Sequence, residues 1–223
     1  MMKLVVSISA LAALLLFGSC REVIPFEQPV GSVNGYEMRG RVTSINGVPV
    51  ESVAVSLDYD FDVVGDTPMD TIPFVEPNPP KVIQVDAYDY LGRHVRQIYT
   101  GILPTGPVPR FFWQGYDDAN QLLPSGKYLV RYVLDTTIVK IVPVLIRRHV
   151  TTFTDAHGDF VIKNANLPIG QTFDLYSSTT PDFLGVVRVT KTVYLLFQRS
   201  TLSRSASATL QVNNVYHGAY TIE

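Results

Sequence analysis

The sequence is poor in cysteine and in charged residues. Its 223 residues include one Cys, and Asp, Glu, Lys and Arg together make up 17% of the chain. A single cysteine forms no internal disulfide and cannot supply a cysteine-rich metal site. Lys and Arg number 18 against 20 Asp and Glu, which gives a net charge of −2, and no basic block stands out. The main electrostatic argument for a nucleic-acid partner is therefore missing, and we predict none.

The chain is rich instead in apolar, aromatic and turn-forming residues. Hydrophobic residues make up 46% of it, with 12 Tyr, 11 Phe, 15 Gly and 15 Pro. This length and apolar content suffice for a buried core in one or two domains. The balance of aromatic and turn residues favours strands and turns over helices.

The longest apolar run lies at the N-terminus. Lys3 precedes the run Leu4–Phe17, which only Ser7 and Ser9 interrupt. A comfortable transmembrane helix needs about 20 apolar residues, so this run is short for a membrane span. Its length and its preceding positive charge are typical of a signal peptide.

The end of this run carries a resemblance to a known class of proteins. The residues Leu16-Phe17-Gly18-Ser19-Cys20 resemble the lipobox of bacterial lipoproteins, although Phe17 stands where that motif usually has Leu, Val or Ile. The resemblance implies that residues 1–19 are a lipoprotein signal peptide and that Cys20 is the lipidation site. The alternative is an ordinary secretory signal followed by a free, buried Cys20.

A lipid on Cys20 would hold the mature chain to a membrane without spanning it, because each buried CH₂ of an acyl chain contributes about 0.8 kcal/mol. No later stretch approaches 18 consecutive apolar residues. Residues 20–35 contain Pro25, Pro29 and Gly31 and predict a flexible tether. We expect a protein of the bacterial cell envelope that is lipid-anchored to a membrane (outer membrane, periplasmic or surface face); which membrane and which leaflet stay open.

The rest of the chain has the pattern of β-structure. From Tyr36 onward, apolar and polar residues alternate with the period of two that strands require. Asn46-Gly47 lies between two such runs and predicts a hairpin. Long strands are expected at 138–146 and 186–197, and turn clusters recur at the spacing of β-sandwiches. These patterns predict an all-β fold of antiparallel sandwiches.

Three consecutive segments resemble the Ig-like domain of flagellar hook-capping proteins. They match that family's strand and hairpin, its Trp-x-Gly-x-Asp turn and its Ser-Gly-x-Tyr strand start. The segments are Val82-Ile-Gln-Val-Asp-Ala-Tyr-Asp-Tyr-Leu-Gly-Arg-His-Val-Arg96, Phe112-Trp-Gln-Gly-Tyr-Asp-Asp-Ala-Asn120 and Pro124-Ser-Gly-Lys-Tyr128. The motif is structural, and we expect Trp113 to be a core anchor. The module occurs in many exported proteins, so the resemblance implies no flagellar role.

Segments on either side of it resemble the two halves of a carboxypeptidase regulatory-like domain. Met38–Val55 matches the family's Gly-x-Val strand and Gly-x-Pro turn; Thr152–Phe160 and Leu167–Gly170 match its Thr-Asp-x-x-Gly-x-Phe hairpin and Leu-Pro-x-Gly turn. In carboxypeptidases this prealbumin-like module is a non-catalytic companion. The resemblance implies a discontinuous sandwich of residues 36–76 and 149–223, with residues 77–148 as the inserted Ig-like domain. The alternative is two or three short domains in tandem.

Acidic residues form one candidate site. They cluster between residues 58 and 70, on a segment expected to be a loop. The cluster consists of Asp58, Asp60, Asp62, Asp66 and Asp70. Alternate carboxylates on an extended loop could gather around Ca²⁺, but the fixed Gly and closing Glu of the calcium loop are missing. A solvated loop is the other interpretation, and calcium binding stays open.

The histidines do not point to a metal site. They lie on different segments without the spacing of metal ligands. They are His94, His149, His157 and His217. We expect His94 and His157 to face solvent in hairpins, and Asp155 and Asp159, which flank Gly158, to shape a turn. No nucleophile elbow or phosphate-binding loop occurs. We therefore predict no enzyme activity, no metal and no cofactor.

Aromatic residues form the last candidate site, a surface on which sugar rings could stack. Their positions on predicted strands and in the Trp motif favour a core role over such a surface. The residues are Tyr88, Tyr90, Phe111, Phe112, Trp113 and Tyr116. The preferred hypothesis is a membrane-anchored envelope lipoprotein with a structural, scaffolding or protein-binding role. The alternative is a carbohydrate- or peptidoglycan-binding lipoprotein.

Overall fold

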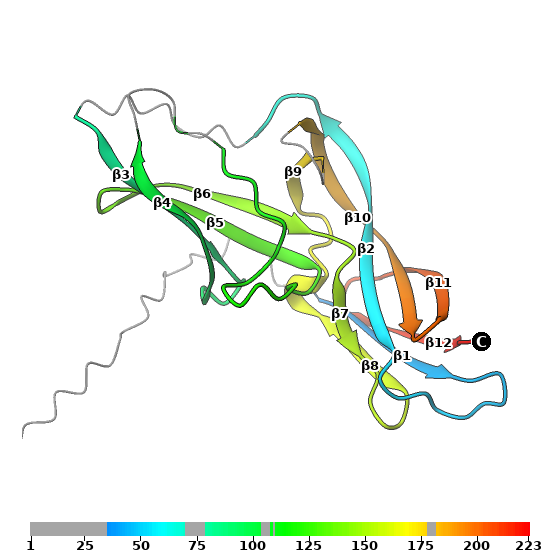
Figure 1. Cartoon of the computed structure of the whole chain (residues 1–223). Helices are drawn as coiled ribbons and strands as arrows, with labels where there is room; N and C mark the ends of the chain where they lie inside the picture. Colours follow the sequence, from blue (N-terminus) through cyan, green and yellow to red (C-terminus); the bar gives the residue numbers. More distant parts are fainter. Residues whose placement is uncertain (1–34, 70–78, 104–107, 109, 178–181) are drawn as a thin grey trace, which may run out of the picture.

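The computed structural model describes residues 35–69, 79–103, 108, 110–177 and 182–223 (Figure 1). The predictions for the signal peptide, for Cys20 and for nearly all of the tether lie outside these residues. The all-β prediction is confirmed, because apart from a short 3₁₀ turn (η1, Asn164–Asn166) every described element is a strand. No helix in the described ranges is both long and apolar enough to cross a membrane.

The strands form three sheets. The three-stranded sheet has the order β12 (Asn214–Thr221), β1 (Tyr36–Thr43), β8 (Asp159–Lys163). The five-stranded sheet has the order β11 (Leu202–Thr209), β10 (Phe183–Arg199), β2 (Ala54–Gly65), β7 (Val150–Phe153), with β9 (Thr172–Tyr176) also pairing with β10. The four-stranded sheet has the order β4 (His94–Leu103), β3 (Lys81–Tyr88), β5 (Gly126–Leu134), β6 (Thr137–Ile146).

The three-stranded and five-stranded sheets enclose the larger core. Alternation along β1 buries Met38, Gly40 and Val42 and leaves Arg39 and Arg41 exposed, as expected of a strand with one face on a core. Rings from both sheets meet inside: Phe197 of β10 lies 5.7 Å from Phe160 and 4.5 Å from Tyr220 between ring centroids. The two sheets therefore form a sandwich.

Strand pairing joins segments that are far apart in the sequence. β1 pairs antiparallel with β8, so that Gly40 lies opposite Phe160, and β2 pairs antiparallel with β7, so that Ala54 lies opposite Phe153. A discontinuous sandwich requires this pairing across the residues between. One pair departs from the antiparallel pattern, since β1 and β12 run parallel. Parallel pairing is possible because the two strands are far apart in the sequence, so that no short hairpin has to connect them.

The predicted turn at Asn46-Gly47 forms, but its strands separate. Gly47 has a φ of 76°, and its N–H donates to the carbonyl of Ser44 over 2.9 Å. The return arm pairs with β1 only through the bridge between Thr43 and Pro49. The chain then crosses to the other sheet, where it continues as β2. Burial of Val53 on the way explains the crossing, since it fills the core between the sheets.

The four-stranded sheet projects beside the sandwich (Figure 1). Its turn between β3 and β4 is held by Asp89, whose Oδ1 accepts the N–H groups of Leu91 and Arg93 over 2.9 and 3.0 Å. One face carries a second, smaller core centred on Ile83, Val85 and Val130. In place of a second sheet, the irregular segment 110–123 covers that face.

Candidate functional site

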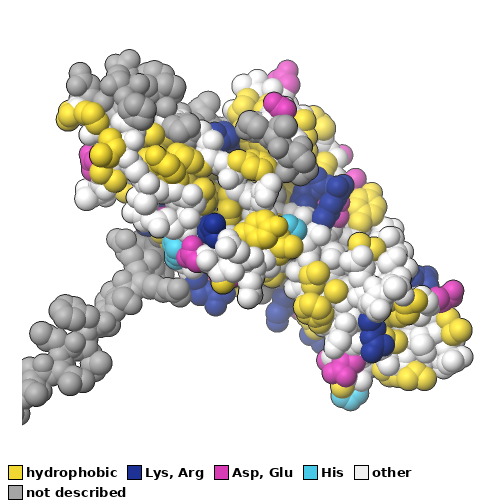
Figure 2. All heavy atoms as spheres, viewed as in Figure 1, with side chains coloured by type: hydrophobic (Ala, Val, Ile, Leu, Met, Phe, Trp, Pro, Cys, Tyr) yellow, Lys and Arg dark blue, Asp and Glu magenta, His cyan; other side chains and the backbone are white. Residues whose placement is uncertain are grey.

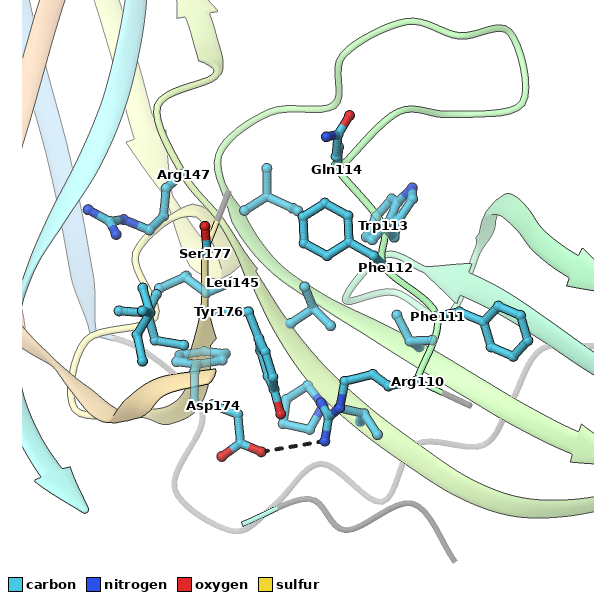
Figure 3. A pocket seen from close by; sticks show the side chains of 18 of the residues that line it. Arg110, Phe111, Phe112, Trp113, Gln114, Leu145, Arg147, Asp174, Tyr176 and Ser177 are labelled. Atoms are coloured by element: carbon cyan, nitrogen blue, oxygen red, sulfur yellow. Dashed lines mark ion pairs between the residues drawn. The ribbon is translucent and has the colours of Figure 1, made fainter. Parts of the chain in front are cut away.

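A groove of about 580 Å³ lies where the four-stranded sheet meets the sandwich (Figure 3). Three stretches of chain line it: residues 110–114, residues 142–149 at the end of β6, and residues 173–177 around β9. Figure 2 shows hydrophobic side chains close to Lys and Arg side chains in this part of the surface. An apolar concavity of this size with a few polar groups is typical of ligand sites.

The wall formed by residues 110–116 is aromatic. Phe111 stacks on Tyr99 with 4.5 Å between ring centroids, whereas Phe112 projects into the groove and is 43% exposed (Figure 3). Trp113 is only partly buried, so the prediction that it is a core anchor is too strong. Its ring packs edge-on against Tyr128 at 5.5 Å, and its Nε1 donates to the carbonyl of Tyr116 over 2.8 Å.

The six aromatic candidates therefore divide. Tyr88 is buried, Phe111 packs against the smaller core, and Tyr90 is exposed at the turn between β3 and β4. Four of the six line the groove. They are Phe111, Phe112, Trp113 and Tyr116. The sequence could not separate these roles, because the covering segment 110–123 has no strand period to show which side chains point inward.

The opposite wall is held by a charged contact. The Arg110 guanidinium lies 4.5 Å from the ring centroid of Tyr176, and its Nη2 is 4.0 Å from Oδ2 of Asp174 (Figure 3). The other carboxylate oxygen of Asp174 accepts the N–H of Met69 over 2.9 Å. Asp174 thus links β9 to the chain after β2 and positions a cation at the edge of the groove.

The third wall is the corner between β6 and β7, which is rich in arginine. Nε of Arg147 and Nε of Arg148 each donate to Asp58 over 2.7 Å. Burial alone would raise the pKa of Asp58, but hydrogen bonds from the two arginines and from the Tyr59 N–H outweigh it and lower that pKa below its usual range. Nδ1 of His149 lies 2.8 Å from the Leu123 carbonyl. Two guanidinium groups thus share one carboxylate at this corner.

The acidic cluster proves to have a different setting from the one expected. Residues 58–65 belong to strand β2, so the prediction of an acidic loop is wrong over that stretch. Asp58 is held by the arginines, Asp60 accepts the Thr190 hydroxyl over 3.0 Å, and Asp66 contacts Thr67. Alternate strand residues are roughly 7 Å apart, too far to share one ion without other ligands. Asp70 lies outside the described residues.

Within the described part of the chain, no three His, Cys, Asp or Glu side chains gather as metal ligands would. Asp155 shapes the predicted turn, since its Oδ1 accepts the N–H groups of His157 and Asp159 over 2.8 and 2.9 Å. Asp159 makes a two-bond contact with Arg41, which lowers the pKa of Asp159. His157 is exposed as expected, and His217 lies on the outer face of β12 near Arg41.

His94 departs from its prediction as a solvent-facing turn residue. It begins β4 and is half-buried between two carboxylates, with Nε2 3.5 Å from Asp86 and Nδ1 3.6 Å from Asp118. Asp86 is fully buried and lies opposite Arg131 in the register of β3 and β5. The available signal for this cluster was one charged residue between apolar neighbours in each strand, Asp86 in β3 and Arg131 in β5.

Sequence patterns did not predict the groove, apart from four of its aromatic residues. Arg110, Arg147 and Asp174 come from segments about 30 residues apart or more in the sequence, and no motif links them. Only the packing of the four-stranded sheet beside β9 brings them together. Comparison of the chain with family models, with curated proteins and with solved structures finds no match.

Proposed function

We propose that this chain is a lipid-anchored, non-catalytic binding protein of the bacterial cell envelope and that the groove is its binding site. The observation that carries the proposal is the groove, which combines an exposed Phe112, the partly buried Trp113 and an arginine-rich corner on a framework of strands. A lipid on Cys20 would hold the chain at a membrane. Residues 20–35 would then give the body its reach.

The polar groups of the groove support binding in preference to catalysis. The Asp174 carboxylate contacts the Arg110 guanidinium and the backbone N–H of Met69. Nδ1 of His149 contacts the backbone carbonyl of Leu123. These partners fix the walls in place. General acid–base or nucleophilic catalysis requires a nucleophile and a base within hydrogen-bond reach of each other, and the contacts of these two side chains are structural.

The alternative is a carbohydrate- or peptidoglycan-binding lipoprotein. Phe112, Trp113 and Tyr116 favour it, because aromatic rings at the wall of a groove offer apolar faces for sugar rings.

We also propose that the inserted architecture inferred from the two family resemblances applies to this chain. Pairing of β1 with β8 and of β2 with β7 supports it.

Two experiments test the two parts of this proposal. Cys20→Ala should move the protein from the membrane fraction to the soluble fraction, and retention of the variant in the membrane would contradict the lipid anchor.

The second experiment tests the groove. A photo-crosslinking residue at position 112, in cells, should give a discrete adduct with a binding partner. The matched control is position 45, where Ile45 is 67% exposed on the distant turn after β1. Equal yields of adduct at both positions, or no adduct at position 112, would contradict the proposal that the groove is the binding site.

A further inference from the structure

The way in which β6 borders the groove shows which part of the strand faces it. A strand that turns a side-chain face toward a cavity contributes every second residue, because successive side chains point to opposite faces. β6 contributes every residue from Val142 to Ile146. The groove therefore borders both faces of the strand, as expected where a groove runs along a strand's edge.

That edge carries no strand in the described part of the chain. β6 is the last strand of its sheet, and β5 is the strand that pairs with it. In an antiparallel ladder the N–H and C=O of one residue point to the same side, and the next residue points to the other. Proline is confined to positions where its nitrogen does not face a paired strand. Pro143, which lies opposite Leu129 of β5, therefore directs its backbone toward the groove.

Ile141 and Leu145 share this orientation, since each is two residues from Pro143 and the register is regular over this stretch. Their N–H and C=O groups and the Pro143 carbonyl are thus available to an added strand. Pro143 also withholds one donor, which limits uncontrolled pairing at an exposed edge. The stretch Val142–Ile146 spans roughly 17 Å at the usual rise of a strand.

The surroundings of this edge specify the chemistry of its partner. Arg148 is 75% exposed at its side chain and shares Asp58 with Arg147, so the corner carries more positive than negative charge. Arg110 stands across the groove beside Asp174. Between these charges, Phe112 offers an apolar contact (Figure 3). An extended segment with acidic and aliphatic side chains complements both features.

We propose that the groove binds an extended, acidic segment of a partner protein, which adds as a strand to the free edge of β6. This inference rests on the proposed function in taking the groove as a binding site. Main-chain hydrogen bonds provide affinity in such complexes, and side-chain contacts provide specificity. A simple peptide with the correct charge pattern should therefore bind measurably.

The test uses the protein as purified from the membrane or soluble fraction of cells, in detergent, and fluorescein-labelled heptapeptides. The probes are alternating Glu-Val and Lys-Val peptides and two Glu-Val peptides that are N-methylated at one or the other set of alternate residues. The Glu-Val peptide should bind more tightly than the Lys-Val peptide. One N-methylated set should lose roughly tenfold or more in affinity relative to the other, because it removes the donors that face β6.

Two protein variants locate the site. Arg148→Glu should weaken binding of the Glu-Val peptide roughly tenfold. Arg39→Glu is the matched control, since Arg39 is also exposed and contacts a carboxylate, Glu37, over 2.6 Å on the distant three-stranded sheet. We expect the control to bind as the parent does. Because N-methylation changes only the peptide, its effect does not depend on how well a variant folds.

The outcomes separate the two proposals. Equal affinity for the Glu-Val and Lys-Val peptides, or an equal loss of affinity for the two N-methylated peptides, would overturn the proposed strand addition. If the Glu-Val peptide fails to bind while a hexamer of N-acetylglucosamine binds and Phe112→Ala abolishes that binding, this inference fails and the proposed binding function stands. If neither probe binds, both fail.

Discussion

The two cores of this protein are built in different ways. In the sandwich, two sheets face each other around a cluster of hydrophobic side chains, among them Phe160, Phe197 and Tyr220. In the four-stranded sheet, one face is covered by the irregular segment 110–123, and strand positions on the other face bury the charged pair Asp86 and Arg131. The first core is closed by strands on both sides. The second is closed by a loop.

This difference explains why the groove lies where it does. Two paired sheets fill the space between them with interdigitating side chains, so they leave little room at the centre. A covering loop follows the sheet less closely. Segment 110–123 places Phe111 against the smaller core but leaves Phe112 outside it. The accessible edge of β6 then completes the groove next to β9.

The largest effect is expected in the sandwich core. Phe197→Ala removes a fully buried ring that contacts Phe160 and Tyr220. The lost burial and the remaining cavity should lower the free energy of unfolding by about 4 kcal/mol. Urea denaturation followed by circular dichroism measures it. A loss below about 1 kcal/mol would show that the two sheets are not packed through these rings.

A somewhat smaller effect is expected from the charged pair in the four-stranded sheet. Arg131→Met leaves the fully buried Asp86 without the cation that lies 3.4 Å from its Oδ2. Removal of one partner from a buried pair should cost about 3 kcal/mol. Asp86→Asn combined with Arg131→Met should recover part of that loss in the same urea titration. A double variant less stable than Arg131→Met would contradict the pairing.

Substitution of Trp113 tests the covering loop. Trp113→Ala removes a partly buried ring, so we expect a loss of about 2 kcal/mol, less than for a fully buried aromatic. Hydrogen exchange should locate the loss in residues 110–123 and in the four-stranded sheet. The sandwich amides should exchange as in the parent. An equal increase in the exchange rates of both regions would show that the two cores unfold as one unit.

The smallest effect concerns the contact between the two regions. Asp58→Asn weakens the link between β2 and the arginines that follow β6 and should cost about 1 kcal/mol at neutral pH. The folded protein holds the pKa of Asp58 below its ordinary value of 3.8, so the charged contact stabilises the fold above that pH. The stabilisation is lost as the pH falls through the lowered pKa.

Thermal melting of Asp58→Asn and the parent between pH 7 and pH 2 measures this dependence. The difference between their melting temperatures should be largest near pH 7 and should shrink toward pH 2. Asp159→Asn is the comparison variant: Arg41 lowers the pKa of Asp159 in the same direction, but solvent screens this exposed pair, so its change with pH should be smaller. A difference for Asp58→Asn that does not change with pH would contradict the ion pair.

Particular elements show how far sequence patterns reach. The alternation in β1 and the turn at Asn46-Gly47 depend on neighbouring residues, and both form. The prediction of an acidic loop was wrong over residues 58–65. A run of aspartates favours a loop, but the valine and aromatic residues between them allow strand β2 to continue. His94 misled for a similar reason: its position near a turn was clear, but its two carboxylate neighbours come from other segments.

Local sequence patterns suffice to specify the all-β fold and the main turns, and a short motif predicts lipid attachment at Cys20. The fold class and the turns follow from local period and from backbone preference, which depend on neighbouring residues. Long-range packing, in contrast, places Arg110, Arg147 and Asp174 around one groove and, within the described residues, leaves the edge of β6 without a further paired strand. Those outcomes depend on how three sheets pack, and packing is settled by long-range contacts that no local pattern records.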